Sequence, residues 1–400
     1  MKSTYIYFAA LCIITTITFV KHANPMGKIL MVLYTFIGFF SVMALKMGLI
    51  INDKITFLPY LFLLTVYLIS FAPFLFKQYK FSADKLIVTV NKKYIIFAIL
   101  FILASLVSLK VQLPYALKLL ASGDWNENRA NLYKGAFTMA YTWYEYYAIQ
   151  FSSYTRLLGI LVGFVLVRSD KKYMWLGFTT ILSGASVLIV SAMSQSSRGS
   201  IVNIALLLGV LFVFFFNELG NKSRIYFSIL IFIGFLAVVP YVVEVTMSRF
   251  SDGAIDSLVS YFGQSPVVFN YGVFDIDKLS FGKYAFGNLF DLGNISPSDV
   301  GGSWGSGFYT YVGWLYLDWG FIGTIVTASL ISWICIRIIR KKTYTVSDIY
   351  IVFFVYYSLL QGVFVIGRDY CYNILMTIII YYFVKVIFDK YTFLIGRYGL

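Results

Sequence analysis

The sequence predicts an all-α polytopic integral membrane protein with about eleven transmembrane helices and one long outward-facing loop. Two observations support this prediction. The 400 residues are 60% hydrophobic and only 12% charged, and a soluble protein of this length could not bury so much apolar surface. The apolar residues also gather into runs of about 20, the length of helix that crosses a hydrocarbon core of about 30 Å.

The expected helices divide residues 1–400, which we treat as a single transmembrane domain. The first apolar run follows Lys2 and resembles a signal peptide. The sequence "KHANPM" after it lacks a small-residue cleavage site, so we expect this run to remain as a helix. The expected helices are 4–20, 28–50, 55–76, 94–111, 153–168, 173–193, 200–217, 225–246, 308–335, 346–366 and 371–388.

The basic residues predict the orientation, because cytoplasmic loops of membrane proteins are enriched in Lys and Arg. With eleven helices, all the basic clusters fall on one side of the membrane, which places the N-terminus outside and the C-terminus in the cytoplasm. The clusters lie at 77–93, 168–172, 217–224, 335–348 and in the C-terminal tail. The opposite, outward side holds 112–152, 194–199, 248–307 and 367–370.

The same distribution excludes several classes of function. The net charge of +14 lies in short clusters between apolar runs, which indicates membrane topology and not a nucleic-acid surface. The three cysteines have no CxxC spacing and the chain has one histidine, so we expect no metal site. No nucleotide-binding motif occurs either. We therefore expect no cofactor, and any synthesis outside the membrane would need an activated, lipid-linked substrate.

Arginines on the outward side are the candidates for substrate binding. The guanidinium group is always charged and presents a planar fork of donors that matches phosphate oxygens, which would suit a lipid-linked pyrophosphate at the membrane surface. Alternatively, each arginine extends to lipid headgroups or pairs with a nearby acid. The candidates are Arg129, Arg156, Arg198, Arg249 and Arg368.

Arg198 has the most informative surroundings of these. It lies in "SAMSQSSRGSIVNIALLL", where a turn of small residues leads directly into an apolar helix. The start of a helix carries partial positive charge and free N–H groups, so an arginine beside it makes an anion site. The alternative is an ordinary serine N-cap with an arginine that only marks topology.

A carboxylate is the expected general base, because His22 is expected on the cytoplasmic side. Asp318 lies about ten residues into the apolar run "GFYTYVGWLYLDWGFIG", where an acid is costly and faces a cavity or a partner. It is either a base for a sugar hydroxyl or a hydrogen-bonding group that fixes the fold. Glu145, within "YTWYEYYAIQ", is surrounded by aromatics that could raise its pKa. The further candidates are Asp124, Glu127, Asp252, Asp291 and Asp299.

The segment 248–307 interrupts the apolar pattern between the eighth and ninth expected helices. It is rich in Gly, Asp and aromatics and poor in basic residues. Loops of this length usually serve a function. We expect this segment to act as a lid that holds the glycan, while arginines around it contact the phosphates. Its aromatic side chains either stack on sugars or form the core of a small subdomain.

The layout, the "SSRGS" turn before a helix and the motif "FYTYVGWLYLDWGFIG" after the long loop resemble Wzy-type O-antigen (oligosaccharide repeat-unit) polymerases. The resemblance covers most of the chain in layout and rests on short motifs in sequence. It implies a GT-C-like glycosyltransferase of the bacterial inner membrane, with its active site facing the periplasm. Such enzymes transfer a growing glycan from undecaprenyl pyrophosphate onto a lipid-linked repeat unit, without a metal or a nucleotide sugar.

The resemblance also implies roles for individual residues and partners. Arg198 matches the family's pyrophosphate-binding arginine by motif and position, whereas Arg129, Arg249 and Arg368 match by location only. The related ligases have an outward histidine, which this chain lacks, so the resemblance favours the polymerase. A flippase and a chain-length regulator are the implied protein partners, beside membrane lipid and the lipid-linked glycans.

Two other functions fit an outward-facing membrane protein of this kind. The first is a lipid-linked oligosaccharide flippase or another polysaccharide transporter, which we would expect to have two related halves and charges on many helices around a central cavity. No internal repeat is evident in the sequence. The second is a membrane scaffold whose long loop docks a partner protein.

Overall fold

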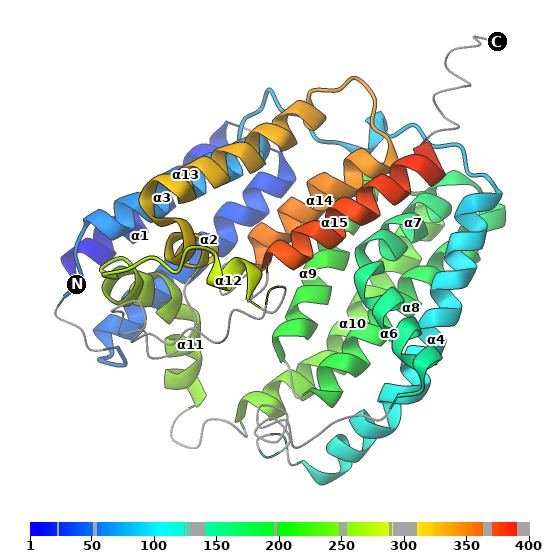
Figure 1. Cartoon of the computed structure of the whole chain (residues 1–400), viewed down its shortest axis with the longest axis horizontal. Helices are drawn as coiled ribbons and strands as arrows, with labels where there is room; N and C mark the ends of the chain where they lie inside the picture. Colours follow the sequence, from blue (N-terminus) through cyan, green and yellow to red (C-terminus); the bar gives the residue numbers. More distant parts are fainter. Residues whose placement is uncertain are drawn as a thin grey trace. The chain divides into compact units, whose positions relative to one another are not determined.

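The computed structural model describes residues 1–21, 24–50, 54–123, 125, 127, 141–195, 198–247, 254–287, 290, 310–362 and 370–389. These residues form helices joined by short turns (Figure 1). Within those ranges no strand occurs, and one isolated bridge joins Leu86 to Tyr344. The prediction of an all-α protein is therefore confirmed.

A helix coincides with each of the eleven expected transmembrane segments. Seven of the described helices are long and apolar enough to cross a membrane, which fits a polytopic membrane protein. They are α1 (Lys2–Val20), α2 (Pro25–Lys46), α3 (Leu58–Leu75), α4 (Lys92–Ser122), α8 (Met174–Ser194), α13 (Tyr311–Ile339) and α15 (Tyr370–Val384), the last continued by a π-turn.

The remaining expected segments form the helices α6, α7, α9, α10 and α14, which are not among these seven. α6 (Trp143–Tyr154) and α7 (Arg156–Ser169) make an eighth span if they act as one, with a bend of 64° between them. α9 (Arg198–Phe215) and α14 (Val346–Gln361) are apolar but short over their described residues, and α10 spans Asn221–Met247. The number of eleven spans thus remains a prediction.

The chain forms two compact units. The first comprises Met1–Phe81, Gly253–Lys342 and Ile351–Ile379. The second comprises Ser82–Asp252, Thr343–Tyr350 and Ile380–Leu400.

Buried aromatic side chains hold the first unit together. The ring of Tyr34 on α2 lies edge-on to Tyr67 and Phe71 of α3, with centroid distances of 4.7 and 4.8 Å. The hydroxyl of a buried tyrosine also needs a hydrogen-bond partner, because lipid offers none. The Tyr34 hydroxyl donates to the carbonyl of Leu359 at 2.7 Å, and that of Tyr356 donates to the carbonyl of Met26 at 2.8 Å. These bonds join α2 to the part of α14 that belongs to this unit.

The described part of the long segment 248–307 is largely helical. α11 spans Ala254–Val268 and a π-turn continues it to Val273. The Ser41 hydroxyl on α2 donates to the carbonyl of Gly263 at 2.8 Å, and the Asn270 amide exchanges two hydrogen bonds with the backbone of Thr56, at 2.9 and 3.0 Å. α11 therefore packs on α2 (Figure 1). Residues 248–253, 288–289 and 291–307 lie outside the described ranges.

Several aromatic side chains of this segment belong to the protein core, whereas Phe281 and Phe290 are exposed. Phe269 is fully buried, 5.9 Å from Phe274 between ring centroids, and Phe262 packs on Phe40 of α2 at 5.5 Å. Tyr284 lies edge-on to Trp314 at 4.7 Å. Of the two alternatives for these aromatics, their packing favours the core of a subdomain over stacking on sugars.

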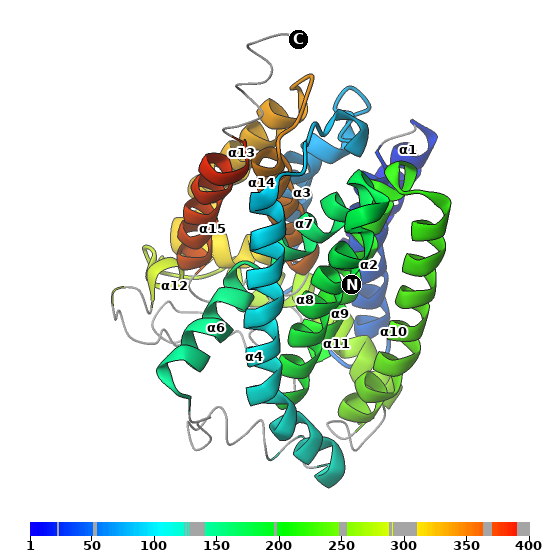
Figure 2. The same ribbon diagram turned by 90° about the vertical axis from the view of Figure 1, so that its right-hand side faces the viewer.

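In the second unit, α8 packs against α4, α7 and α9 (Figure 2). Glycines let α7 and α8 approach closely: a Cβ atom at Gly177 would lie 2.6 Å from the carbonyl oxygen of Gly163. α4 presents a buried row of Ser105, Ser108 and Gln112 at helical spacing. The hydroxyls of Ser108 and Ser152 lie 2.8 Å apart, so this row joins α4 to α6.

Candidate substrate-binding site

A polar cavity of about 310 Å³ lies in the second unit among α4, α6, α7 and α8. Eight of the ten residues that line it are polar, which is unusual among such apolar helices. The polar ones are Gln112, Tyr141, Gln150, Ser153, Arg156, Ser191, Ser194 and Gln195.

The cavity lies at the helix ends that the basic clusters predict to face outward. Ser191 and Ser194 form the last turn of α8, and Arg156 is the first residue of α7. Gln112 lies about 30 Å along α4 from Lys92, at 1.5 Å per residue. That distance equals the thickness of a hydrocarbon core. The cavity is therefore expected at the outer membrane surface, where a lipid headgroup would lie.

The bend between α6 and α7 brings a guanidinium group to the cavity. The Thr155 hydroxyl donates to the carbonyl of Phe151 at 2.6 Å, and α7 begins at the next residue. The Arg156 Nη2 donates to the Ser153 hydroxyl at 3.2 Å across the bend. Arg156 is the one charged residue among those that line the cavity. Among the described residues, the lining thus combines this one positive charge with amides and hydroxyls.

Gln112 adds an acceptor that the protein leaves unused. Its side chain is 7% exposed, and its Oε1 accepts no hydrogen bond. A buried carbonyl oxygen without a donor costs about 1–3 kcal/mol, so such groups are rare. Because Gln112 lines the cavity, a turn of its side chain would bring this oxygen to a donor of a bound ligand.

The turn that carries Arg198 directly follows the wall of this cavity. Gln195 lines the cavity at the end of α8, and α9 begins at Arg198, three residues later. The side chain of Arg198 lies outside the described part, as do Arg129, Arg249 and Arg368 altogether. Of the five predicted arginines, the structure thus places Arg156 at the cavity, and Arg198 follows the lining residue Gln195 by three positions in the sequence.

The segment after α4 is anchored at the same helix ends. Trp125 is 1% exposed, and its indole Nε1 donates to Glu244 Oε1 of α10 at 3.2 Å. Its ring lies edge-on to Tyr241 at 5.2 Å, and the Tyr241 hydroxyl donates to the carbonyl of Ala192 in α8 at 3.3 Å. Trp125 thereby holds the start of the outward segment 112–152 against α8 and α10.

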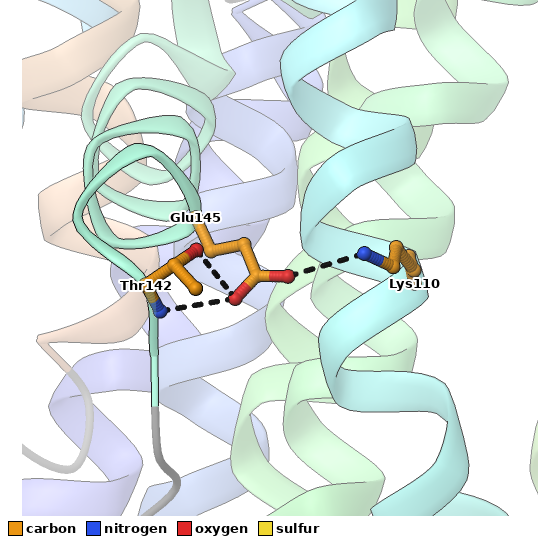
Figure 3. A network of polar contacts seen from close by, with 3 residues as sticks. All are labelled: Lys110, Thr142 and Glu145. Atoms are coloured by element: carbon orange, nitrogen blue, oxygen red, sulfur yellow. Dashed lines mark hydrogen bonds and ion pairs between the residues drawn. The ribbon is translucent and has the colours of Figure 1, made fainter.

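Glu145 caps the start of α6 (Figure 3). It is not among the residues that line the cavity. Its Oε2 accepts from the backbone N–H of Thr142 at 3.0 Å and from the Thr142 hydroxyl at 2.8 Å. Its Oε1 lies 3.3 Å from the ammonium of Lys110. The bonds from Thr142, with a smaller effect of Lys110, hold the pKa of Glu145 below its usual value. The expectation of a raised pKa is therefore wrong, because aromatic neighbours matter less than this capping box.

Asp318 is fully buried in the first unit, and its carboxylate accepts four hydrogen bonds. The donors are the backbone N–H groups of Tyr284 and Ala285 at 3.1 and 2.8 Å, the Tyr370 hydroxyl at 2.8 Å, and the Ser280 hydroxyl. The arrangement joins α13 to α15 and to the short helix α12 (Lys283–Phe286). It favours the alternative in which Asp318 fixes the fold over a role as base.

Comparison with protein-family models, curated proteins and solved structures finds no match to this chain. The site must therefore be judged from its own chemistry. Among the described residues, no group of three or more His, Cys, Asp or Glu side chains could hold a metal ion.

Sequence reasoning missed two features of this site. Gln112 stands alone as an amide in an apolar run, and its spacing from Ser105 and Ser108 was the available signal for a buried polar row. The contact between Trp125 and Glu244 joins residues far apart in the chain, and no local pattern indicates it.

Proposed function

We propose that this chain is a membrane glycosyltransferase that polymerises undecaprenyl-pyrophosphate-linked repeat units at the periplasmic face of a bacterial inner membrane. The polar cavity with Arg156 at its wall supports this proposal. A guanidinium group binds phosphate oxygens in pairs, and amides and hydroxyls bind sugar hydroxyls. A flippase that supplies the repeat units and a chain-length regulator complete the proposed setting.

In the proposed reaction, Arg156 and Arg198 bind the pyrophosphate of the donor lipid. The acceptor hydroxyl attacks the anomeric carbon of the donor glycan, and a new glycosidic C–O bond forms as the bond to pyrophosphate breaks. The electron pair leaves with the pyrophosphate, whose developing charge the arginines stabilise.

The proton of the acceptor hydroxyl passes to a carboxylate of the outward segments. Asp318 and Glu145 are held by their own hydrogen-bond donors. The proposed bases are therefore the other acids expected to face outward: Asp124, Glu127, Asp252, Asp291 and Asp299.

One observation favours the transporter alternative. α13 is broken at Gly320, where φ is 64° and ψ is −164°, and secondary transporters bind substrates at broken helices. At this break, however, four donors of the protein already bind the adjacent Asp318 carboxylate. The cavity beside Arg156 contains an acceptor without a donor, so we place the substrate there and not at the broken helix. We therefore favour the polymerase.

The test uses purified protein in liposomes with synthetic undecaprenyl-pyrophosphate repeat units. A polymerase produces a ladder of glycans that differ by one repeat unit, and a transporter moves the lipid across the bilayer without joining the units. Movement without a ladder, for repeat units of several compositions, would replace the polymerase with the transporter.

A further inference from the structure

We propose that the cavity binds the sugar attached directly to the donor pyrophosphate, and that Gln112 selects an uncharged sugar by accepting a hydrogen bond from it. This inference rests on the proposed function and assigns a substrate class to the same site. The donor on the sugar would be a hydroxyl or an acetamido N–H, both of which suit an amide oxygen.

The burial of Gln112 is the first argument for this assignment. An exposed glutamine would satisfy its oxygen with water, but this oxygen is buried and accepts no bond. The protein thus keeps an acceptor that destabilises the empty state. Once the side chain turns toward the cavity, a ligand that donates to this oxygen gains a bond without displacing an existing one. Sites built around such an acceptor reject analogues that lack the donor.

The charges and the volume of the cavity narrow the ligand further. Of the described residues that line the cavity, Arg156 is the charged one and none is a carboxylate. One cation can bind one phosphate group, but it leaves no partner for the carboxylate of an acidic sugar, and it repels an ammonium group. The volume of about 310 Å³ lies at the lower end of the range for small-molecule sites, roughly 300–1,000 Å³. The cavity therefore suits one neutral sugar and an adjoining phosphate.

The order of residues from α8 to α9 agrees with a sugar in the cavity and a pyrophosphate next to it. Ser191 and Ser194 line the cavity, Gln195 ends the helix, and Arg198 follows at the start of α9. The Gln195 Nε2 donates to the Ser191 hydroxyl at 3.4 Å, which holds this last turn in place. In the sequence, hydroxyls suited to a sugar are thus followed closely by an arginine suited to its pyrophosphate.

The test measures the binding of three lipids to the full-length protein in nanodiscs: undecaprenyl pyrophosphate alone, and the same lipid carrying N-acetylglucosamine or glucuronic acid. We expect N-acetylglucosamine to raise the affinity about threefold to tenfold over the sugar-free lipid, the gain of one good hydrogen bond. Glucuronic acid should give no gain.

The decisive variant is Gln112→Met, which keeps the length of the side chain and removes the amide. It should lose the gain from N-acetylglucosamine and keep the affinity for the sugar-free lipid. Gln264→Met, in α11, makes the same change outside the cavity and should keep both. Because the Gln112 oxygen is unpaired in the empty protein, Gln112→Met should not lower the thermal unfolding midpoint. If Gln112→Met does not fold, Gln112→Asn is the second variant. Its shorter side chain moves the amide oxygen away from the sugar, so it should also lose the gain in affinity from N-acetylglucosamine.

Equal binding of the first two lipids by the wild type, or an equal loss for both in Gln112→Met, would overturn the assignment. This result is distinguishable from failure of the proposed function. If the gain in affinity depends on Gln112 but the protein forms no glycan ladder, the polymerase is rejected and the sugar site stands. If the protein forms a ladder but shows no gain in affinity, the sugar site is rejected and the polymerase stands.

Discussion

Two buried polar side chains, one in each unit, have opposite surroundings among apolar helices. In the first unit, four donors of the protein bind the Asp318 carboxylate. In the second, Gln112 is uncharged, and its oxygen has no donor beside a cavity that holds one arginine. Burial of an acid therefore does not by itself mark a site in this protein. An unsatisfied polar side chain that also lines a cavity is the better indicator of binding.

The largest expected effect follows from removing the satisfied carboxylate. Asp318→Ala should lower the free energy of unfolding by at least about 3 kcal/mol, because each buried donor left without an acceptor costs about 1–3 kcal/mol. Thermal unfolding in detergent measures it. Asp256→Ala, an exposed acid in the same unit, should have little effect. If Asp318→Asn unfolded like the wild type but formed no glycan, Asp318 would be a base and the contrast between the units would fail.

The second effect concerns activity at the cavity. Arg156→Ala should reduce the rate of polymerisation about 100-fold, since one donor that stabilises a developing charge is worth about 10²–10³ in rate. Arg156→Lys should recover only part of the rate, because an ammonium group lacks the planar fork. The rate at which the glycan ladder lengthens measures both.

The matched control for Arg156 is Arg337→Lys, an exposed arginine at the end of α13 that stacks on Trp333. It is expected on the cytoplasmic side, so the rate should stay at the wild-type value. Full activity of Arg156→Ala would remove the cavity from the reaction.

The third effect is a dependence on pH at the capping carboxylate. Because the pKa of Glu145 is lowered in the folded protein, its stabilising contribution is present above the usual carboxyl pKa and is lost as the pH falls through the lowered value. The unfolding midpoint of Glu145→Gln should lie below that of the wild type at neutral pH, and the two should converge in acid. Polymerisation should continue in this variant, and its loss at full stability would indicate a catalytic Glu145.

The smallest effect concerns an arginine of the second unit that does not line this cavity. Arg168 pairs with Glu218 at 2.9 Å and donates to the carbonyl of Leu86 at 3.0 Å. Both charged side chains are partly exposed, so the pair is worth only about 0–1 kcal/mol. Glu218→Gln should therefore shift the unfolding midpoint slightly and leave polymerisation unchanged. A loss of activity as large as that of Arg156→Ala would show that an arginine outside the cavity is as important as the one that lines it.

The positions of the helices could be predicted because lipid imposes a simple rule on the sequence. An apolar run of about 20 residues has few alternatives to a helix, and each expected segment coincides with one. Helix ends were less predictable. α4 continues to Ser122, beyond the expected end at 111, because Lys110 and Lys118 interrupt the apolar run without breaking the helix. α11 was missed since its polar and aromatic residues do not form a transmembrane run.

The candidate site could be predicted only in part. Arg156 was found because the chemistry of a phosphate requires a particular residue type. The cavity depends on how α4, α6 and α8 pack, and the periodicity of a single helix does not contain that information. The same limit applies to Asp318, whose donors come from segments distant in the sequence, so both of its alternatives remained open until the contacts were known.

The central claim is that the cavity beside Arg156 binds the lipid-linked donor. Its most direct test is cryo-electron microscopy of the protein in nanodiscs with a synthetic undecaprenyl-pyrophosphate repeat unit. We predict phosphate density within about 3 Å of the Arg156 guanidinium, with the first sugar beside Gln112. Density for the glycan at the break in α13 near Asp318, with the cavity empty, would contradict the account.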